Sequence, residues 1–76
     1  MEFSVVLKRI SDSLYLGFKT GISGLPTPFY TDSIKDAWYY RSRVCISDSR
    51  IYNCKMFLQL NGREIEISEK DLDSGF

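Results

Sequence analysis

The chain has 76 residues, of which 43% are hydrophobic and 26% charged, and its ten Lys/Arg residues balance its ten Asp/Glu residues. This length and composition predict one small globular domain spanning 1-76 and exclude a disordered tail or a pair of domains. Zero net charge and a pI near 6.2 disfavour nucleic acid as a partner, because binding to phosphates needs a basic surface. No apolar run reaches the ~18–20 residues of a membrane-spanning helix, and no signal-peptide pattern opens the chain, so we expect a cytoplasmic protein without membrane contact.

The charges are distributed unevenly along the chain. Residues 1–63 carry nine Lys/Arg against five Asp/Glu, whereas residues 64–76 carry one Lys against five Asp/Glu, which gives +4 and −4. The simpler interpretation is a solvated acidic segment that lies near the chain's own basic surface. The alternative is a segment that imitates an anionic polymer toward a basic partner.

Two alternating segments near the N-terminus predict a β-hairpin. Residues 2–10 and 14–20 alternate apolar and polar side chains, and Ser11-Asp12-Ser13 separates them with residues that favour turns. Pairing Ile10 with Leu14 would place Val6 opposite Phe18. One face of the hairpin would then carry Val6, Ile10, Leu14, Leu16 and Phe18.

Residues 21–28 contain two glycines and two prolines, which predicts a long loop. The loop and the residues after it are more apolar than an ordinary linker, with Ile22, Leu25, Phe29 and Tyr30. Two interpretations stay open: a loop packed over the core, or a binding loop with Leu25 and Tyr30 as contact residues.

The sequence around Ser33 predicts the start of a helix of about ten residues, because Ser33 followed by Asp36 is close to a capping box. Ile34, Ala37 and Trp38 recur at helical spacing and would face the sheet. Since Trp, Tyr and Val also favour sheets, the alternative is a strand over 37–46.

A second hairpin is predicted over 44–54, with a polar turn at Asp48-Ser49-Arg50. Pairing Val44 with Cys54 and Ile46 with Tyr52 keeps apolar side chains on one face. This register separates Cys45 from Cys54, so we expect no disulfide.

The most specific local pattern is the hairpin over 54–69 with its turn at Asn61-Gly62. Asn-Gly tolerates the positive φ angles of a type I′ turn. That turn pairs Leu60 with Arg63, Leu58 with Ile65 and Met56 with Ile67, which puts the apolar side chains on one face. We expect one helical turn over 68–72 and a frayed tail over 71–76.

The residue types that carry most catalysis are absent or isolated. The chain has no histidine and only two cysteines, at spacings that match no zinc or redox motif. Glu64 and Glu66 share a strand face, but nothing nearby predicts a pocket that would raise either pKa. We therefore expect a protein that is not an enzyme and that has no catalytic, cofactor-binding or metal-binding residues.

The most unusual segment runs from Trp38 to Arg43 and interleaves aromatic and basic residues. A short helix cannot bury three adjacent aromatic side chains on one stripe, so at least one would face solvent. Tyr, Trp and Arg are enriched in interface hot spots, which makes Tyr39, Tyr40, Arg41 and Arg43 candidate contacts with a protein partner. The alternative is that Tyr40 packs on the sheet edge and the arginines pair with the acidic segment.

Together these elements predict an α+β domain, with an antiparallel sheet of two hairpins and one helix packed on it in the order β-β-α-β-β(-β). The alternative is a small all-β barrel. The outline is similar to that of several small phage-encoded inhibitors, although no motif carries the similarity. The predicted function is non-enzymatic binding of a protein, as in inhibition of a larger enzyme or complex. The alternatives are a self-associating module, which pairs through residues 2–10 or the last hairpin, and a single-stranded nucleic-acid binder.

Overall fold

The computed structural model describes residues 4–73 and contains a five-stranded antiparallel sheet with the strand order β3-β2-β1-β4-β5. The strands are β1 Val5–Arg9, β2 Tyr15–Thr20, β3 Pro26–Thr31, β4 Cys54–Leu60 and β5 Arg63–Ile67. The predicted α+β class with an antiparallel sheet is confirmed. The sheet is open, with β3 and β5 at its two edges, so the alternative of a closed all-β barrel is wrong.

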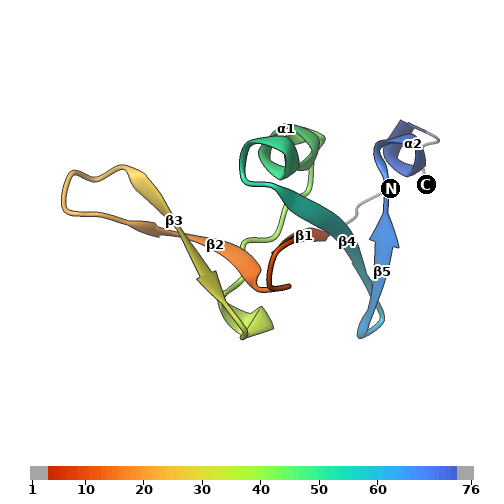
Figure 1. Ribbon diagram of the computed structural model, residues 1–76, viewed down its shortest axis with the longest axis horizontal. Helices are drawn as coiled ribbons and strands as arrows, with labels where there is room; N and C mark the ends of the chain where they lie inside the picture. The colour runs from red at the N-terminus through yellow and green to blue at the C-terminus, as the bar shows by residue number, and fades with distance from the viewer. Residues whose placement is uncertain (1–3, 74–76) are drawn as a thin grey trace.

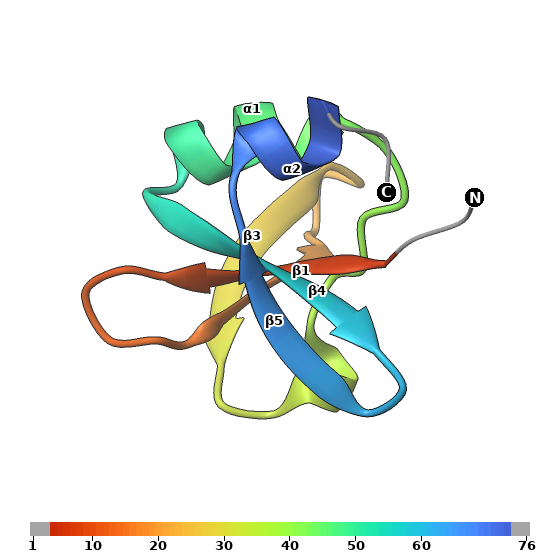
Figure 2. The same cartoon turned by 90° about the vertical axis from the view of Figure 1, so that its right-hand side faces the viewer.

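Three helical segments cover the sheet: a 3-10 helix η1 over Ile34–Asp36, α1 over Val44–Ile51 and α2 over Glu69–Asp73. α1 and α2 lie beside each other on one face, and the short η1 lies toward the opposite face (Figures 1 and 2). The hairpin of β2 and β3 extends away from this body (Figure 1). We call residues 15–31, which comprise β2, its turn and β3, the arm.

The predicted ten-residue helix after Ser33 is reduced to the single turn of η1. Ser33 makes no side-chain capping bond, and the backbone is extended at Ala37. We call residues 37–43, between η1 and α1, the linker. It forms tertiary hydrogen bonds instead: the Trp38 N–H donates to the Leu16 carbonyl at 3.0 Å, and Tyr40 exchanges two backbone bonds with Val5 at 2.8 and 2.9 Å. The linker thus fills the gap between β1 and β2, and these contacts override local helix propensity.

The predicted hairpin over 44–54 is wrong, because Val44–Ile51 is the helix α1. The expected turn at Asp48-Ser49-Arg50 lies inside that helix. Only Cys45 and Ile46 are buried, so the apolar stripe is too short to produce a clear helical period. The helix is followed by Asn53 at φ 56°, a left-handed residue that redirects the chain into β4.

The first hairpin forms, but its predicted register is wrong by one residue. Lys8 pairs with Tyr15, and the turn between the strands includes Ser13 at φ 62°. A shift of one residue moves every side chain to the other face. Val5 and Leu7 therefore join Leu16 in the main core, while Val6 is buried outside that cluster.

The predicted loop over 21–28 is shorter than expected, since β3 begins at Pro26. Two prolines are tolerated there because β3 is an edge strand. The Asn61-Gly62 hairpin is confirmed with all three expected pairs. The predicted turn over 68–72 is confirmed by α2, which also contains residues 71–73 of the expected frayed tail; residues 74–76 lie outside the described part.

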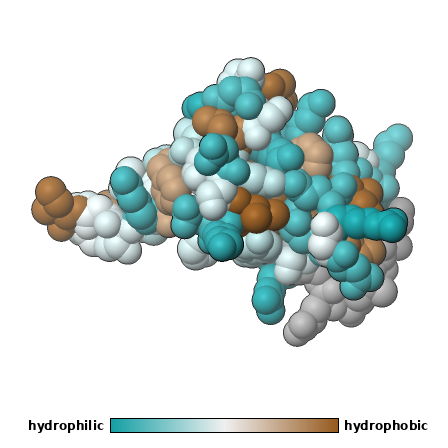
Figure 3. Space-filling view, turned by 90° about the horizontal axis from the view of Figure 1, so that it is seen from below, coloured by the Kyte–Doolittle hydropathy of each residue, from teal (hydrophilic) through white to brown (hydrophobic). Residues whose placement is uncertain are grey.

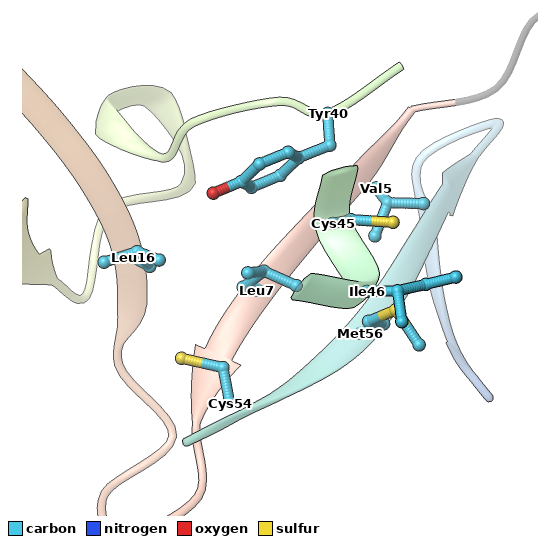
Figure 4. Packing of buried hydrophobic residues seen from close by; sticks show 8 residues of the cluster. All are labelled: Val5, Leu7, Leu16, Tyr40, Cys45, Ile46, Cys54 and Met56. Atoms are coloured by element: carbon cyan, nitrogen blue, oxygen red, sulfur yellow. The ribbon is translucent and has the colours of Figure 1, made fainter. Parts of the chain in front are cut away.

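The main core lies between the sheet and α1 (Figure 4). The Tyr40 ring projects from the linker into the space between β2 and β1, near Leu16 and Leu7 (Figure 4). Cys45 on α1 and Cys54 at the start of β4 are both buried free thiols. The expected absence of a disulfide agrees with this, although the hairpin register from which it was predicted does not exist.

Candidate functional site

An open groove with a volume of about 490 Å³ separates the arm from the linker and α1. We call it the arm groove. Its lining comes from Phe18, Lys19 and Thr20 of β2, Pro26 of β3, the linker residues Trp38, Tyr39, Tyr40, Arg41 and Ser42, and Val44 and Asp48 of α1.

Aromatic side chains dominate the groove. Trp38 is 49% exposed and Tyr39 is 42% exposed, which is high for such large residues. The rings of Trp38 and Phe18 meet edge to face with centroids 5.8 Å apart, and Phe18 makes a second edge contact with Tyr52. The contact with Tyr52 fixes the position of the Phe18 ring, and the Trp38 ring packs against it.

The extended backbone of the linker explains why Tyr40 is buried while the residues on either side of it are exposed. Successive residues of an extended segment point to opposite sides, so Tyr40 enters the core while Tyr39 and Arg41 turn outward. Tyr40 is only 5% exposed, and its hydroxyl donates to the Asp48 carboxylate at 2.6 Å. Burial, followed by this hydrogen bond, raises the pKa of Tyr40 well above its ordinary value.

One cation that lines the groove has no ion-pair partner among residues 4–73, and that cation is Arg41. Lys19 also belongs to the lining, but its ammonium lies 5.7 Å from the centre of the Phe29 ring, on the face of the arm opposite Phe18. The acidic lining residue Asp48 accepts the Tyr40 hydroxyl. An anionic group entering the groove would therefore meet Arg41.

The arm ends in an apolar tip. Ile22 is fully exposed and Leu25 is 66% exposed. Figure 3 shows hydrophobic atoms at the far end of the arm, separate from the apolar atoms on the body. Gly24 at φ 80° shapes the turn, and the Gly21 N–H closes it on the Leu25 carbonyl at 3.1 Å.

The predicted contact residues fall in different places. Tyr39 and Arg41 line the groove and Leu25 lies at the tip, whereas Tyr30 is partly buried at the base of the arm under the Arg9 guanidinium, 3.8 Å from its ring. Tyr40 belongs to the core and is not available as a contact. The sequence places it on the same surface as Tyr39 only if both belong to a helix.

Arg43 lies outside the groove lining and pairs with Asp73 of α2 at 2.6 Å. Arg50 similarly pairs with Glu69 at 2.5 Å. The acidic segment therefore lies against the chain's own arginines, as in the simpler of the two interpretations. Each pair is more than 45% exposed and adds little stability.

Sequence reasoning misses Trp38, Phe18 and Lys19 as groove residues. A helix over this segment would turn Trp38 toward the sheet. Strand-like alternation from Trp38 to Arg41 separates Tyr39 and Arg41 from the buried Tyr40, but it does not identify Trp38, which it places on the side of Tyr40. No local pattern could have placed Phe18 beside Trp38, because that contact depends on the tertiary path of the linker.

Glu64 joins the two halves of the sheet on the face away from the core. It accepts the Tyr15 hydroxyl at 2.5 Å and pairs with Lys8 at 3.0 Å. Burial tends to raise its pKa, but the hydrogen bonds from Tyr15 and Lys8 outweigh that effect and lower the pKa. A carboxylate held ionised in this way is a structural anchor and is poorly suited to act as a general acid.

The two thiols are also poorly suited to nucleophilic chemistry. Burial raises the pKa of Cys54 to about 11 and raises that of Cys45 as well, so both stay protonated at neutral pH. Within the described residues, no group of three or more His, Cys, Asp or Glu could hold a metal ion.

Comparison with known proteins gives no further assignment: no protein-family model, no curated protein and no solved structure matches this chain. Among residues 4–73, no helix has both the length and the apolar character needed to cross a membrane.

Proposed function

We propose that this protein acts without catalysis by binding another protein, and that the arm groove and the arm tip form the contact surface. The observation that carries the proposal is the half-exposed pair Trp38 and Tyr39, set beside Arg41 in one groove. These are the residue types most enriched in interface hot spots. Blocking a larger enzyme or complex is the form of activity that suits so small a binding surface.

The groove and the tip are parts of one continuous surface. Lys19, Thr20 and Pro26 line the groove and lie next to the turn that carries Ile22 and Leu25. Partner contact along this surface would cover large apolar side chains that otherwise face water. Free, protonated thiols are in keeping with a reducing cytoplasmic environment.

The test is capture of the partner from an extract of the native host with immobilised protein. Trp38→Ala combined with Arg41→Ala should abolish recovery of proteins that the unmodified chain retains, since hot-spot truncation commonly costs more than about 2 kcal/mol of binding energy. The retained proteins are identified by mass spectrometry, and binding is then measured with the purified partner.

The matched control is Arg63→Ala combined with Ile65→Ala, which also removes a cation and an exposed apolar side chain but does so on β5. Ile65 is 43% exposed and lies outside the groove. Equal losses in both double variants, or full binding by the groove variant, would refute this contact surface.

A second candidate function, self-association, is favoured by the free edge of β5. β5 ends the sheet, and Leu60 and Ile65 of the terminal hairpin are exposed beside this edge. The other edge expected from the sequence lies in residues 2–10, but the part of it that forms β1 is the central strand of the sheet and offers no free edge. Light scattering over a range of concentrations tests this candidate, and a monomer at the highest concentration would refute it.

A further inference from the structure

β2 has two edges: one pairs with β3, and the other, which we call the inner edge, faces β1 and the linker. The inner edge carries backbone groups that no strand pairs with. Pro28 lies opposite Phe18 and Pro26 lies opposite Thr20 in the β2–β3 ladder. Proline has no N–H, so these positions are the pairs that exchange no hydrogen bonds with β3. In an antiparallel ladder, the N–H and C=O groups of such residues point to the other side of the strand.

The contacts of Leu16 confirm this direction. Leu16, Phe18 and Thr20 are alternate residues of one strand, so their backbone N–H and C=O groups point to the same edge. The Leu16 carbonyl accepts the Trp38 N–H at 3.0 Å from the linker side. Beyond Leu16 the linker leaves β2 and the groove opens. Within residues 4–73, no backbone group pairs with the N–H and C=O of Phe18 or Thr20 on that side.

The outer edge of the arm is closed to the same kind of pairing. The residues of β3 whose backbone groups point away from β2 include Pro26 and Pro28, and neither has an N–H to donate to a further strand. Prolines on an edge strand prevent the addition of another strand. The arm therefore offers strand pairing on its inner edge only, where the groove lies.

The side chains beside this edge define what a bound segment would carry. Phe18 and Trp38 form an apolar contact for one side chain of the segment. Arg41 lines the same groove and, within residues 4–73, forms no ion pair, so an acidic side chain of the segment would be attracted to it.

We infer that the partner enters the arm groove as an extended acidic segment that pairs with Phe18 and Thr20 as an added β-strand. This mode of recognition takes its affinity from main-chain hydrogen bonds and its specificity from alternate side chains. The inference rests on the proposed function and specifies the kind of partner: a polypeptide with an exposed, negatively charged strand or tail.

The experiment uses peptides selected from a random display library on the immobilised protein, with Trp38→Ala used to remove peptides that bind elsewhere. The enriched peptides should carry net negative charge and one recurrent apolar position. Each is then synthesised with single backbone N-methyl groups placed along it. Methylation at alternate positions should weaken binding about tenfold, while the positions between them should tolerate it.

A matched pair of variants tests the edge from the side of the protein. Thr20→Pro removes the N–H that faces the groove and leaves the ladder to β3 intact, because Thr20 donates no bond to Pro26. Thr20→Val keeps the N–H with a side chain of similar shape. We expect peptide binding to fall about tenfold in Thr20→Pro and to persist in Thr20→Val. Circular dichroism verifies the fold of both.

Several results would overturn the inference. These are failure to enrich any peptide, enrichment of basic peptides, tolerance of N-methylation at every position, or peptide binding that is equal in the two Thr20 variants. Preferential, steeply salt-dependent binding of an oligothymidine probe would assign the groove to single-stranded nucleic acid instead. If the captured partner of the previous section binds the groove through a folded surface, this inference fails while the proposed function stands. Loss of both partner capture and peptide binding would remove both.

Discussion

Two hairpins of the same sheet differ in how they are attached. The terminal hairpin joins the body through β4, which pairs with β1 at five positions from Val5 to Arg9. In the described residues, the arm is joined to β1 at one strand pair, Lys8 with Tyr15, and to the linker through the bond from Trp38 to Leu16. The terminal hairpin completes the core. The arm leaves a strand edge and an apolar tip in solvent, which makes it the region suited to contact a partner.

The largest difference in stability is expected between substitutions at the base of the arm and at its tip. Leu16 is fully buried in the main core, so Leu16→Ala should lower the free energy of unfolding by about 2–5 kcal/mol through lost burial and a residual cavity. Ile22→Ala at the tip should change it by less than about 0.5 kcal/mol. Urea unfolding measures both, and equal losses would show that the tip supports the fold.

Gly17→Ala should destabilise the protein by about 1–3 kcal/mol. An added Cβ would lie 2.6 Å from the Asp36 carbonyl oxygen and 2.7 Å from the Phe29 ring, so η1 would have to move. Gly21→Ala, also in the arm, meets only the rotatable Thr27 hydroxyl at 3.0 Å and the Leu25 carbonyl at 3.7 Å, and should cost less. A thermal unfolding series ranks the two, and the reverse order would refute close packing of η1 on the arm.

Alanine substitutions in the turns at Gly62 and Gly24 should give a smaller difference in stability. Gly62 has φ 78° and Gly24 has φ 80°, and an added Cβ would meet no described atom within 4 Å at either position, so alanine introduces backbone strain alone at both. Gly62→Ala should cost about 1–2 kcal/mol. Gly24→Ala should cost less, because the tip can rearrange without uncovering the core. Equal costs in urea unfolding would mean that the arm unfolds together with the body.

The hydrogen bond from Tyr15 to Glu64, which joins the arm to β5, should give a modest pH dependence. Burial, then this bond, raises the pKa of Tyr15 to about 12 from its ordinary 10.0. The contribution of Tyr15 is therefore complete below pH 10 and is lost as the pH rises toward 12. The lowered pKa of Glu64 makes its contribution present above the ordinary value and lost as the pH falls through the folded value.

The free energy of unfolding, measured from acidic pH to about pH 12, should fall at both ends of the range in the unmodified protein. Tyr15→Phe should lower the free energy of unfolding by about 1 kcal/mol at neutral pH and reduce its dependence on alkaline pH. Tyr52→Phe is the control, because the Tyr52 hydroxyl makes no hydrogen bond within residues 4–73 and has no part in the pKa shift of Tyr15. An alkaline slope unchanged by Tyr15→Phe would assign it to other groups.

The same contrast explains which parts of the fold are predictable from sequence. At Asn61-Gly62 the turn residues and the apolar faces specify one register, and the observed pairs match it. The first hairpin has a looser turn, and its register differs by one residue from the most apolar alternative. There, Val5 and Leu7 are selected by packing against α1 and the linker, which a local pattern does not contain.

The region between the hairpins is the least predictable. Local signals favour a helix after Ser33 and a hairpin around Asp48, whereas the linker pairs with Val5 and Leu16 and α1 begins at Val44. Both differences arise from contacts between residues distant in sequence. The candidate site is therefore only partly predictable: Tyr39 and Arg41 are identified by residue type, but the groove exists because the linker passes between β1 and β2.

Residue-resolved amide hydrogen exchange of the free protein is the most direct test of the open strand edge. The amides of Gly17 and Lys19 point toward β3, while those of Phe18 and Thr20 point into the groove. We predict slow exchange at the first pair and fast exchange at the second, an alternation within one strand. Exchange at Phe18 and Thr20 as slow as at Gly17 and Lys19 would show that the edge is already paired, and would contradict the account.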